Sequence, residues 1–311
     1  MKKPNFFIIG APKCGTSTLI NELRWHPQIF VPLAFEPQYF CTDFQATADS
    51  NGIGLAGMSE EQYLELFAEK EEKHLAIGEK SVIYLYSDVA VDNILEFAPD
   101  AKLIVMLRNP IDLIYSWHSQ LYYTFVEDVE DFETAWSLQE SRQRGENIGK
   151  YCVLPFALQY REIGSLGKYI QKLYTQIPRE RVQTIFMEDF HADPDKIYAD
   201  SLEFLDVPFS PRPDKRKLNS NKKHRYRALG EVLAHGTQSP FRKPLDRFAR
   251  LPGIRNFPIK YWLHEWNKVE YKRPSLAPDM RQQLIDEFRD DVNLLEELTE
   301  RDLSHWLKPR Q

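Results

Sequence analysis

Short apolar runs alternate along the chain with segments of helical periodicity. The runs that have the length of buried strands are Phe6–Ile9, Leu75–Ser81, Lys102–Arg108 and Val182–Met187. Between them, apolar residues recur at helical spacing in the segments that begin at Thr16, Asp88 and Pro110. Strands that alternate with helices predict a mostly parallel sheet. We therefore predict an α/β fold of three layers, in which helices flank a central sheet on both faces.

Prolines, capping residues and helical periodicity predict the structure of the other segments. Pro27, Pro32 and Pro37 exclude a long helix between residues 25 and 40, so an irregular return over the sheet edge is expected there. Residues 42–57 are predicted to form a loop. Further helices are expected over residues 59–70, 131–144, 155–176, 193–205 and 226–250. A long amphipathic helix over residues 278–298 completes one predicted domain, 1–311, in which residues 279–311 are a C-terminal helix and tail packed on the rest.

Composition narrows the class of protein. The 42% hydrophobic and 28% charged residues are typical of a soluble globular chain, and the net charge of -6 argues against a general nucleic-acid binder. Three unclustered cysteines indicate a reducing compartment rather than a disulfide framework. The first residues lead directly into a strand, and no apolar run reaches the length of a membrane span. We expect a cytoplasmic protein without a membrane span.

The turn between the first strand and the first helix has the layout of a phosphate-binding site. Backbone N–H groups and the positive end of the helix dipole meet an anion at such a turn. Gly10 and Gly15 have the spacing of the P-loop, G-x-x-x-x-G-K-[ST], so the fold is predicted to be P-loop-like. However, Thr16 follows Gly15 where that motif has lysine, and the loop's lysine is Lys13. Backbone amides, hydroxyls and a displaced lysine can hold a phosphosulfate without a metal.

Two further segments that can bind an anion are predicted at the same edge of the sheet. Arg108 ends a strand, and Ser116 follows two helical turns into the next helix, so both can face one phosphate. Residues 212–227 hold eight Lys or Arg against one acid, which indicates an anion-binding lid or an exposed loop. Because ligands of open α/β sheets bind at the carboxyl ends of the strands, these elements are expected to lie together.

These motifs resemble those of the sulfotransferases. Gly10-Ala-Pro-Lys-Cys-Gly-Thr-Ser-Thr-Leu19 is similar to the family's 5′-phosphosulfate loop, and Leu103–Ser116 is similar to its 3′-phosphate motif. The segments 35–40, with Glu36, and Glu79-Lys-Ser81 resemble the bacterial type and the heparan-sulfate or carbohydrate branch. Asn219–Arg225 resembles the late basic loop that closes on the nucleotide. Ala34, Phe35 and Val82 depart from the family pattern, all on the acceptor side.

The resemblance implies transfer of a sulfuryl group from 3′-phosphoadenosine 5′-phosphosulfate (PAPS) to an acceptor hydroxyl, without a metal. The residues that it implies for the 5′-phosphosulfate are Lys13, Cys14, Gly15, Thr16, Ser17 and Thr18. Those implied for the 3′-phosphate are Arg108 and Ser116, with Arg225 and either Lys222 or Lys223 closing over it. Glu36 is the implied general base, and Lys13 and Lys80 stabilise charge in the transition state. His118, two residues past Ser116, is the second candidate for the base.

Two other functions remain open at this stage. A metal-dependent P-loop nucleotide kinase needs a lysine after Gly15 and an acid that closes an apolar strand, for which Glu188-Asp189 is the candidate. A catalytically silent nucleotide-binding module is the other alternative. The acceptor is expected to be a carbohydrate or a small metabolite, with a lipid also open, and the sequence does not determine the oligomeric state.

Overall fold

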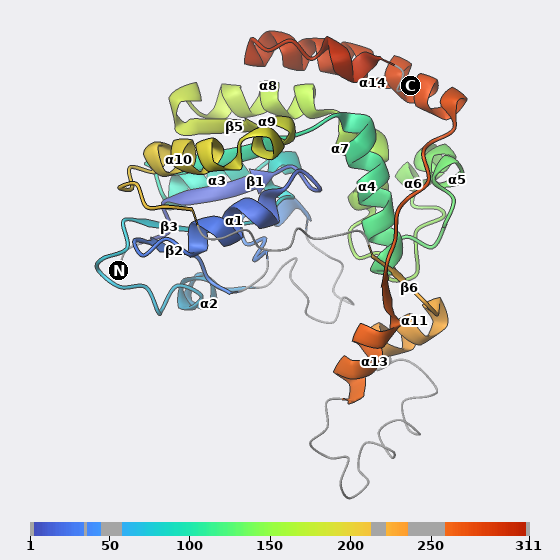
Figure 1. The fold of residues 1–311 in the computed structure, drawn as a ribbon, viewed down its shortest axis with the longest axis horizontal. Helices are drawn as coiled ribbons and strands as arrows, with labels where there is room; N and C mark the ends of the chain where they lie inside the picture. The colour runs from blue at the N-terminus through green and yellow to red at the C-terminus, as the bar shows by residue number, and fades with distance from the viewer. Residues whose placement is uncertain (1–2, 34–35, 45–57, 213–221, 236–258, 309–311) are drawn as a thin grey trace, which may run out of the picture.

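A parallel sheet of five strands forms the centre of the molecule (Figure 1). The computed structural model describes residues 3–33, 36–44, 58–212, 222–235 and 259–308. The strands are β1 (Phe6–Gly10), β2 (Ile29–Phe30), β3 (Ala76–Lys80), β4 (Lys102–Leu107) and β5 (Val182–Phe186). They lie in the order β2-β3-β1-β4-β5, and every neighbouring pair is parallel.

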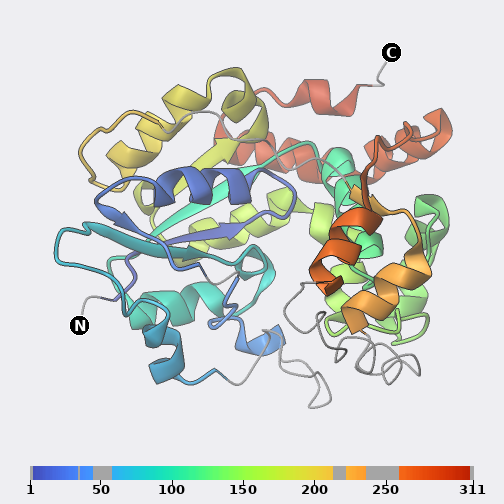
Figure 2. The same cartoon turned by 60° about the horizontal axis from the view of Figure 1, so that its bottom comes forward.

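Helices cover both faces of this sheet (Figures 1 and 2). Helices α1 (Thr16–Arg24) and α10 (Pro194–Phe204) pack on each other over one face. Helices α3 (Ala90–Phe97) and α8 (Leu166–Gln176) pack on each other over the other face. The predicted α/β fold of three layers is therefore confirmed.

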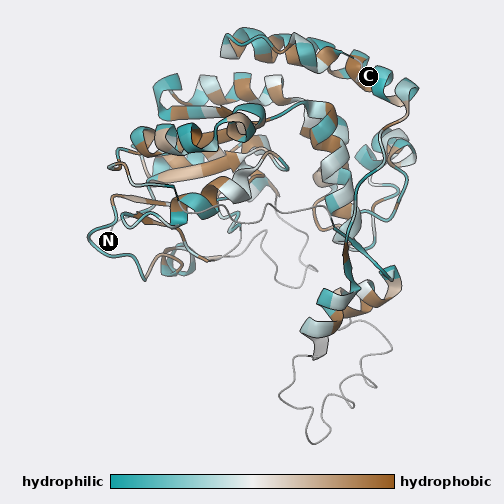
Figure 3. Ribbon diagram, in the orientation of Figure 1, coloured by the Kyte–Doolittle hydropathy of each residue, from teal (hydrophilic) through white to brown (hydrophobic). Residues whose placement is uncertain are grey.

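The core lies where the inner strands, among them β1 and β4, are covered on both sides. Residues Phe6 to Ile9 of β1 and Leu103 to Leu107 of β4 are 0% exposed, so apolar residues occupy every position instead of alternating with polar ones. The edge strand β2 has only two residues, in the segment where the prolines predict irregular structure. In Figure 3 helix α14 (Pro278–Thr299) shows alternating brown and teal bands, the pattern of an amphipathic surface helix.

Helix α14 packs against other helices of the fold. It packs on α8 and on α4 (Pro110–Tyr123), and the carboxylate of Asp291 accepts hydrogen bonds from the backbone N–H groups of Gly167 and Lys168 at 2.8 and 2.9 Å. The tail continues as a 3₁₀ turn, η5 (Ser304–Leu307), and the ring of Trp306 lies 6.0 Å from that of Phe186. Helix α14 and the tail thus contact α4, α8 and β5, whereas the single domain over residues 1–311, with residues 279–311 as its C-terminal helix and tail, stays a prediction.

Two predicted helices are interrupted in the structure. Residues 131–144 form α5 (Phe132–Ser137) and α6 (Gln139–Gln143), and residues 155–176 form η3 (Pro155–Leu158), α7 (Tyr160–Gly164) and α8. A Cβ on Gly164 would lie 2.5 Å from the ring of Phe288, so α7 ends at a glycine where α14 approaches. The side chain of Gln139 accepts a hydrogen bond from the N–H of Arg161 at 2.6 Å, which helps to hold the start of α7. These breaks depend on tertiary contacts that periodicity does not reveal.

A small antiparallel ribbon was also not predicted. Strand β6 (Lys222–His224) pairs with β7 (Lys268–Glu270), between which lie α11 (Arg227–His235) and α13 (Ile259–Asn267). Helix α11 agrees with the predicted start near residue 226, whereas its predicted continuation to residue 250 lies outside the described residues. So do Ala34, Phe35, residues 45–57 of the predicted loop and residues 213–221 of the basic segment.

Short elements complete the chain. They are η1 (Thr42–Phe44), α2 (Glu60–Glu65), η2 (Tyr84–Tyr86), η4 (Arg179–Arg181) and α9 (Met187–Ala192). The predicted capping box opens α2, because the Ser59 hydroxyl accepts from the N–H of Gln62 and the Gln62 side chain accepts from the N–H of Ser59. None of the helices within the described ranges has both the length and the apolar content needed to cross a bilayer.

Candidate active site

The carboxyl ends of three neighbouring strands meet at one edge of the sheet. Strand β1 leads into the loop before α1, β3 ends at Lys80, and β4 leads through Arg108 into α4. Because β1 lies between β3 and β4, the first loop is flanked by chemistry-bearing residues on both sides. Open α/β sheets bind ligands beyond this edge, at the carboxyl ends of the strands.

The loop after β1 depends on glycine at both of its ends and buries a thiol between them. Gly15 has φ +91°, a left-handed conformation that favours glycine, and it precedes the first turn of α1 without a side chain to cap it. A Cβ on Gly10 would lie 2.8 Å from the Cβ of Leu85, so the strand end also requires glycine. Cys14 is 0% exposed, and burial raises the pKa of its thiol to about 12, so this residue belongs to the core beneath the loop.

Positive side chains gather around this loop. The Nζ of Lys13 donates to Gln120 Oε1 at 3.2 Å, and Arg108 Nη1 donates to the carbonyl oxygen of Lys13 at 3.0 Å. Burial lowers the pKa of Lys13 to about 8, and the charges of Arg273, Arg108 and Lys222 act in the same direction. Arg273 Nη1 is buried without a hydrogen-bond partner among the described residues. The four side chains form a group of like charges, which we call the cationic cluster: Lys13, Arg108, Lys222 and Arg273.

One face of α4 borders this cluster. Asp112 Oδ2 lies 3.9 Å from Arg108 Nη2, and Gln120 contacts Lys13. Ser116 is four residues from each, so it lies on the same face of the helix between them, 3% exposed. The structure thus brings Ser116, Arg108 and Lys13 to one side of α4.

The three basic residues of the segment 222–225, which are Lys222, Lys223 and Arg225, differ in their contacts. Lys222 is close enough to Lys13 to lower its pKa. Lys223 instead lies over the ring of Tyr271 at 4.6 Å, and the guanidinium of Arg225 lies over Trp266 at 4.9 Å. Of the three, only Lys222 is brought to the first loop in this structure.

Glu36 and Lys80 form a largely buried ion pair on the other side of the loop. Their side chains are 16% and 6% exposed. Lys80 Nζ also donates to Ser17 Oγ at 3.3 Å, and the N–H of Val82 lies 3.4 Å from Glu36 Oε2. Lys80 therefore connects the carboxylate of Glu36 with the first turn of α1. Thr16 is buried, whereas Ser17 and Thr18 are partly exposed on that turn.

His118 is not part of this arrangement. It is 3% exposed, its Nε2 donates to the carbonyl oxygen of Val129 at 2.9 Å, and its ring packs against Phe132 and Tyr160. Burial lowers its pKa, which disfavours the charged form. These contacts account for a structural histidine and do not support the alternative that it is the base.

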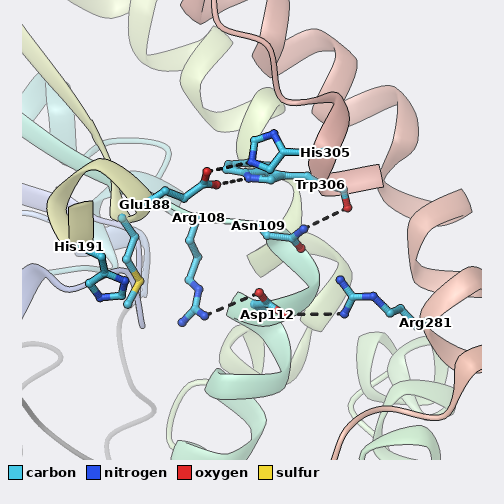
Figure 4. A pocket seen from close by; sticks show the side chains of 9 residues that line it. Arg108, Asn109, Asp112, Glu188, His191, Arg281, His305 and Trp306 are labelled. Atoms are coloured by element: carbon cyan, nitrogen blue, oxygen red, sulfur yellow. Dashed lines mark hydrogen bonds and ion pairs between the residues drawn. The ribbon is translucent and has the colours of Figure 1, made fainter. Parts of the chain in front are cut away.

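The acidic pair that a kinase would need is engaged elsewhere. Glu188 accepts from the indole N–H of Trp306 and lies 2.8 Å from His305 Nε2, and Asp189 pairs with Arg301, with Nη2 at 2.8 Å from Oδ1. Figure 4 shows the contacts of Glu188 with the tail beside a cavity of about 270 Å³ next to Arg108. Because tail residues occupy both carboxylates, the structure does not favour the kinase alternative.

Sequence reasoning missed Arg273, Gln120 and Asp112. Arg273 follows the ribbon strand β7, and nothing in its local sequence marks it as a neighbour of Lys13. Asp112 and Gln120 could have been predicted as neighbours of the site. They lie four residues before and after Ser116, and therefore on the same face of the helix.

Comparison with known proteins places this arrangement in a family. The sulfotransferase domain model matches residues 3–228. A crystal structure of a sulfotransferase from Alicyclobacillus acidocaldarius is 26% identical to this chain, with a TM-score of 0.70 over 99% of this chain and 100% of that one.

Characterised proteins with similar sequences are also sulfotransferases. Carbohydrate sulfotransferase 15 of Mus musculus is 26% identical over 74% of this chain and 49% of that protein. A bifunctional heparan sulfate N-deacetylase/N-sulfotransferase 1 of Caenorhabditis briggsae is 24% identical over 67% of this chain and 23% of that protein. The chain thus spans about half the length, or less, of these relatives. Since the family model covers well over half of the chain, the predicted resemblance is confirmed, and the protein belongs to the sulfotransferase domain family.

Proposed function

We propose that the protein transfers a sulfuryl group from PAPS to an acceptor hydroxyl. The observation that carries the proposal is the cationic cluster beside the open first turn of α1. Burial and then the neighbouring like charges lower the pKa of Lys13, so the ligand-free site holds an excess of positive charge that a polyanion would offset. A nucleotide with a 5′-phosphosulfate and a 3′-phosphate supplies that charge at both ends of the crevice.

Different residues would bind the two ends of the donor nucleotide. The backbone N–H groups of Gly15 and Thr16 and the hydroxyls of Ser17 and Thr18 would hold the 5′-phosphosulfate at the helix N-terminus. Arg108 and Ser116 would bind the 3′-phosphate, for which a guanidinium and a hydroxyl are suitable donors. We add Arg273 to this set, because its buried Nη1 lacks a partner among the described residues. Of Lys222, Lys223 and Arg225, we propose Lys222 as the residue that closes over the donor, because its charge acts on Lys13 and it belongs to the cationic cluster.

Glu36 is the proposed general base. As the acceptor oxygen bonds to sulfur and the bond from sulfur to the bridging oxygen breaks, its carboxylate takes the acceptor's proton. Lys80 stands between Glu36 and Ser17, so a small movement carries its charge from the carboxylate to the sulfuryl oxygens. Lys13 would stabilise the charge that develops on the leaving phosphate. These side chains need no metal for the steps assigned to them.

The acceptor is proposed to be a carbohydrate or small-metabolite hydroxyl. The similarity to carbohydrate and heparan sulfate sulfotransferases supports a carbohydrate, although the chain spans only part of those proteins. A cytoplasmic location remains our prediction.

A labelled-sulfate assay tests the proposal. The protein is incubated with PAPS carrying ³⁵S and a metabolite and oligosaccharide extract, with and without a chelator of divalent cations. We expect labelled acceptor and 3′-phosphoadenosine 5′-phosphate in equal amounts, unaffected by the chelator. Absence of ³⁵S transfer, together with chelator-sensitive transfer of labelled phosphate in a parallel incubation with ATP and Mg²⁺, would support the kinase instead. Calorimetric binding of the nucleotide without transfer to any acceptor would support a silent module.

A further inference from the structure

Glu79 is a buried carboxyl group that the proposed chemistry does not use. It lies on β3 beside Lys80 and is 1% exposed. Its two oxygens accept hydrogen bonds from two hydroxyls, Ser81 Oγ at 2.9 Å and the Tyr84 hydroxyl at 2.8 Å. Burial raises the pKa of Glu79 to about 7, while these hydrogen bonds act to lower it. A carboxyl group buried at this cost needs an explanation.

Both hydroxyls also hold the segment that carries Glu36. Ser81 Oγ accepts from the N–H of Gln38 at 3.0 Å, and the Tyr84 oxygen accepts from the N–H of Phe40 at 3.4 Å. An ionised carboxylate can only accept, so it directs both hydroxyl protons toward itself. The hydroxyl lone pairs are then left facing the two backbone N–H groups.

The segment held in this way has an unfavourable backbone. Glu36 has φ +47° and Gln38 has φ +54°, in the left-handed region that residues other than glycine rarely adopt. Such conformations persist only where surrounding contacts fix them. The two N–H contacts supply such a restraint immediately after Glu36, and the backbone restrained by them sets where its carboxylate meets Lys80.

We propose that Glu79 is a positioning residue for Glu36, acting through the hydroxyls of Ser81 and Tyr84 on the backbone of Gln38 and Phe40. The proposal rests on the proposed function, because it takes Glu36 as the base. It assigns no contact between Glu79 and the donor or the acceptor. Its consequence is that Glu79 affects turnover and not the affinity for the nucleotide.

The sharpest variant is Glu79→Gln, studied above the pKa of Glu79. A carboxamide offers one acceptor oxygen and one donor NH₂ group, so one hydroxyl must accept from the NH₂ group and turn its proton away from residue 79, which weakens its contact with the backbone N–H. We expect kcat to fall about ten- to a hundredfold, since misplacing a reacting group by a fraction of an ångström to about 1 Å has effects of this size. The dissociation constant for 3′-phosphoadenosine 5′-phosphate should stay within about twofold of the parent value. Ser81→Ala and Tyr84→Phe should each reproduce part of the loss in kcat, and they decide the question if Glu79→Gln does not fold.

Asp291→Asn is the matched control. Asp291 is another carboxyl whose pKa burial raises, and it also holds backbone N–H groups, but at the junction of α8 and α14. Its loss should lower the melting temperature and leave kcat of the folded fraction unchanged. If Glu79→Gln behaves in the same way as this control, its role is only structural and the proposal is wrong.

A double-mutant cycle and hydrogen exchange distinguish failure of this proposal from failure of the proposed function. In a Glu36→Gln background, Glu79→Gln should cost no further turnover, whereas a second loss that adds in full would overturn the proposal. Independently of activity, the amides of Gln38 and Phe40 should exchange faster in Glu79→Gln than in the parent, and unchanged exchange would also overturn it. If Glu36→Gln alone keeps the parent's turnover, the assignment of the base fails instead, and the exchange result still reports on the hydrogen-bond relay.

Discussion

The two sides of the first loop differ in how their charges are satisfied. On the proposed donor side, burial together with the like charges of the cationic cluster lowers the pKa of Lys13 to about 8. On the acceptor side, Glu36 and Lys80 neutralise each other, and Glu79 accepts hydrogen bonds through both oxygens. The proposed donor side therefore keeps an excess of positive charge that a bound anion would offset, whereas the charges of the proposed acceptor side are already paired in the free protein.

This difference indicates what each side contributes. Uncompensated charge favours binding of an opposite charge, so the donor side should control nucleotide affinity. A satisfied, largely buried network holds groups in place, so the acceptor side should control turnover. Variants of the two sides should accordingly separate into effects on the dissociation constant and effects on kcat.

The largest effect is expected for Glu36→Gln. Loss of a general base should reduce kcat by about 10²- to 10⁴-fold. The carboxamide oxygen can still accept from Lys80, so folding and nucleotide affinity should persist. Single-turnover transfer and calorimetry with 3′-phosphoadenosine 5′-phosphate measure the two quantities. Near-normal turnover would show that Glu36 is not the base.

Lys13→Met should affect both sides of the comparison. Removing one cation that stabilises developing charge should reduce kcat by about 10²- to 10³-fold. Donor affinity should fall as well, because Lys13 belongs to the cationic cluster. Steady-state kinetics with PAPS measures both losses. The proposed role on the leaving phosphate is contradicted if only the Michaelis constant for PAPS changes.

Arg273→Leu should weaken the donor side alone. A lost hydrogen bond to a charged group costs about 1.5–3 kcal/mol, or about ten- to a hundredfold in nucleotide affinity. The melting temperature of the ligand-free protein should not fall, because the substitution removes a like charge from the cationic cluster. Arg225→Leu is the control, since Arg225 lies over Trp266 and should alter affinity little. Equal losses in the two variants would remove Arg273 from the proposed donor site.

The smallest effect is the dependence of donor affinity on pH. Burial and the neighbouring cations lower the pKa of free Lys13 to about 8, and a bound polyanion should raise it. Linkage then gives full affinity below about pH 8 and a loss of up to about tenfold per pH unit above it, until the pKa of the complex is reached. Calorimetry across this range measures the slope. Lys13→Arg, whose guanidinium stays charged, should remove most of the slope above pH 8 if Lys13 is the titrating group.

Local patterns were enough for much of the fold. The buried strands β1 and β4 could be predicted because residues covered on both faces form continuous apolar runs. The first loop could be predicted because its glycines meet requirements of backbone geometry that are visible in the sequence. In contrast, α5 and α6, the break before α8 and the β6–β7 ribbon depend on contacts between distant segments.

By itself, the sequence determined the α/β order of elements, the phosphate-type loop and the pair of motifs at Lys13 and Arg108, since these depend on residues close together in the chain. Tertiary structure decided which candidates meet. It paired Glu36 with Lys80, moved Arg225 to Trp266, buried His118 against aromatic rings and brought Arg273 within electrostatic reach of Lys13. Charge and burial act through space, and the sequence carries no local record of neighbours that are more than two hundred residues apart.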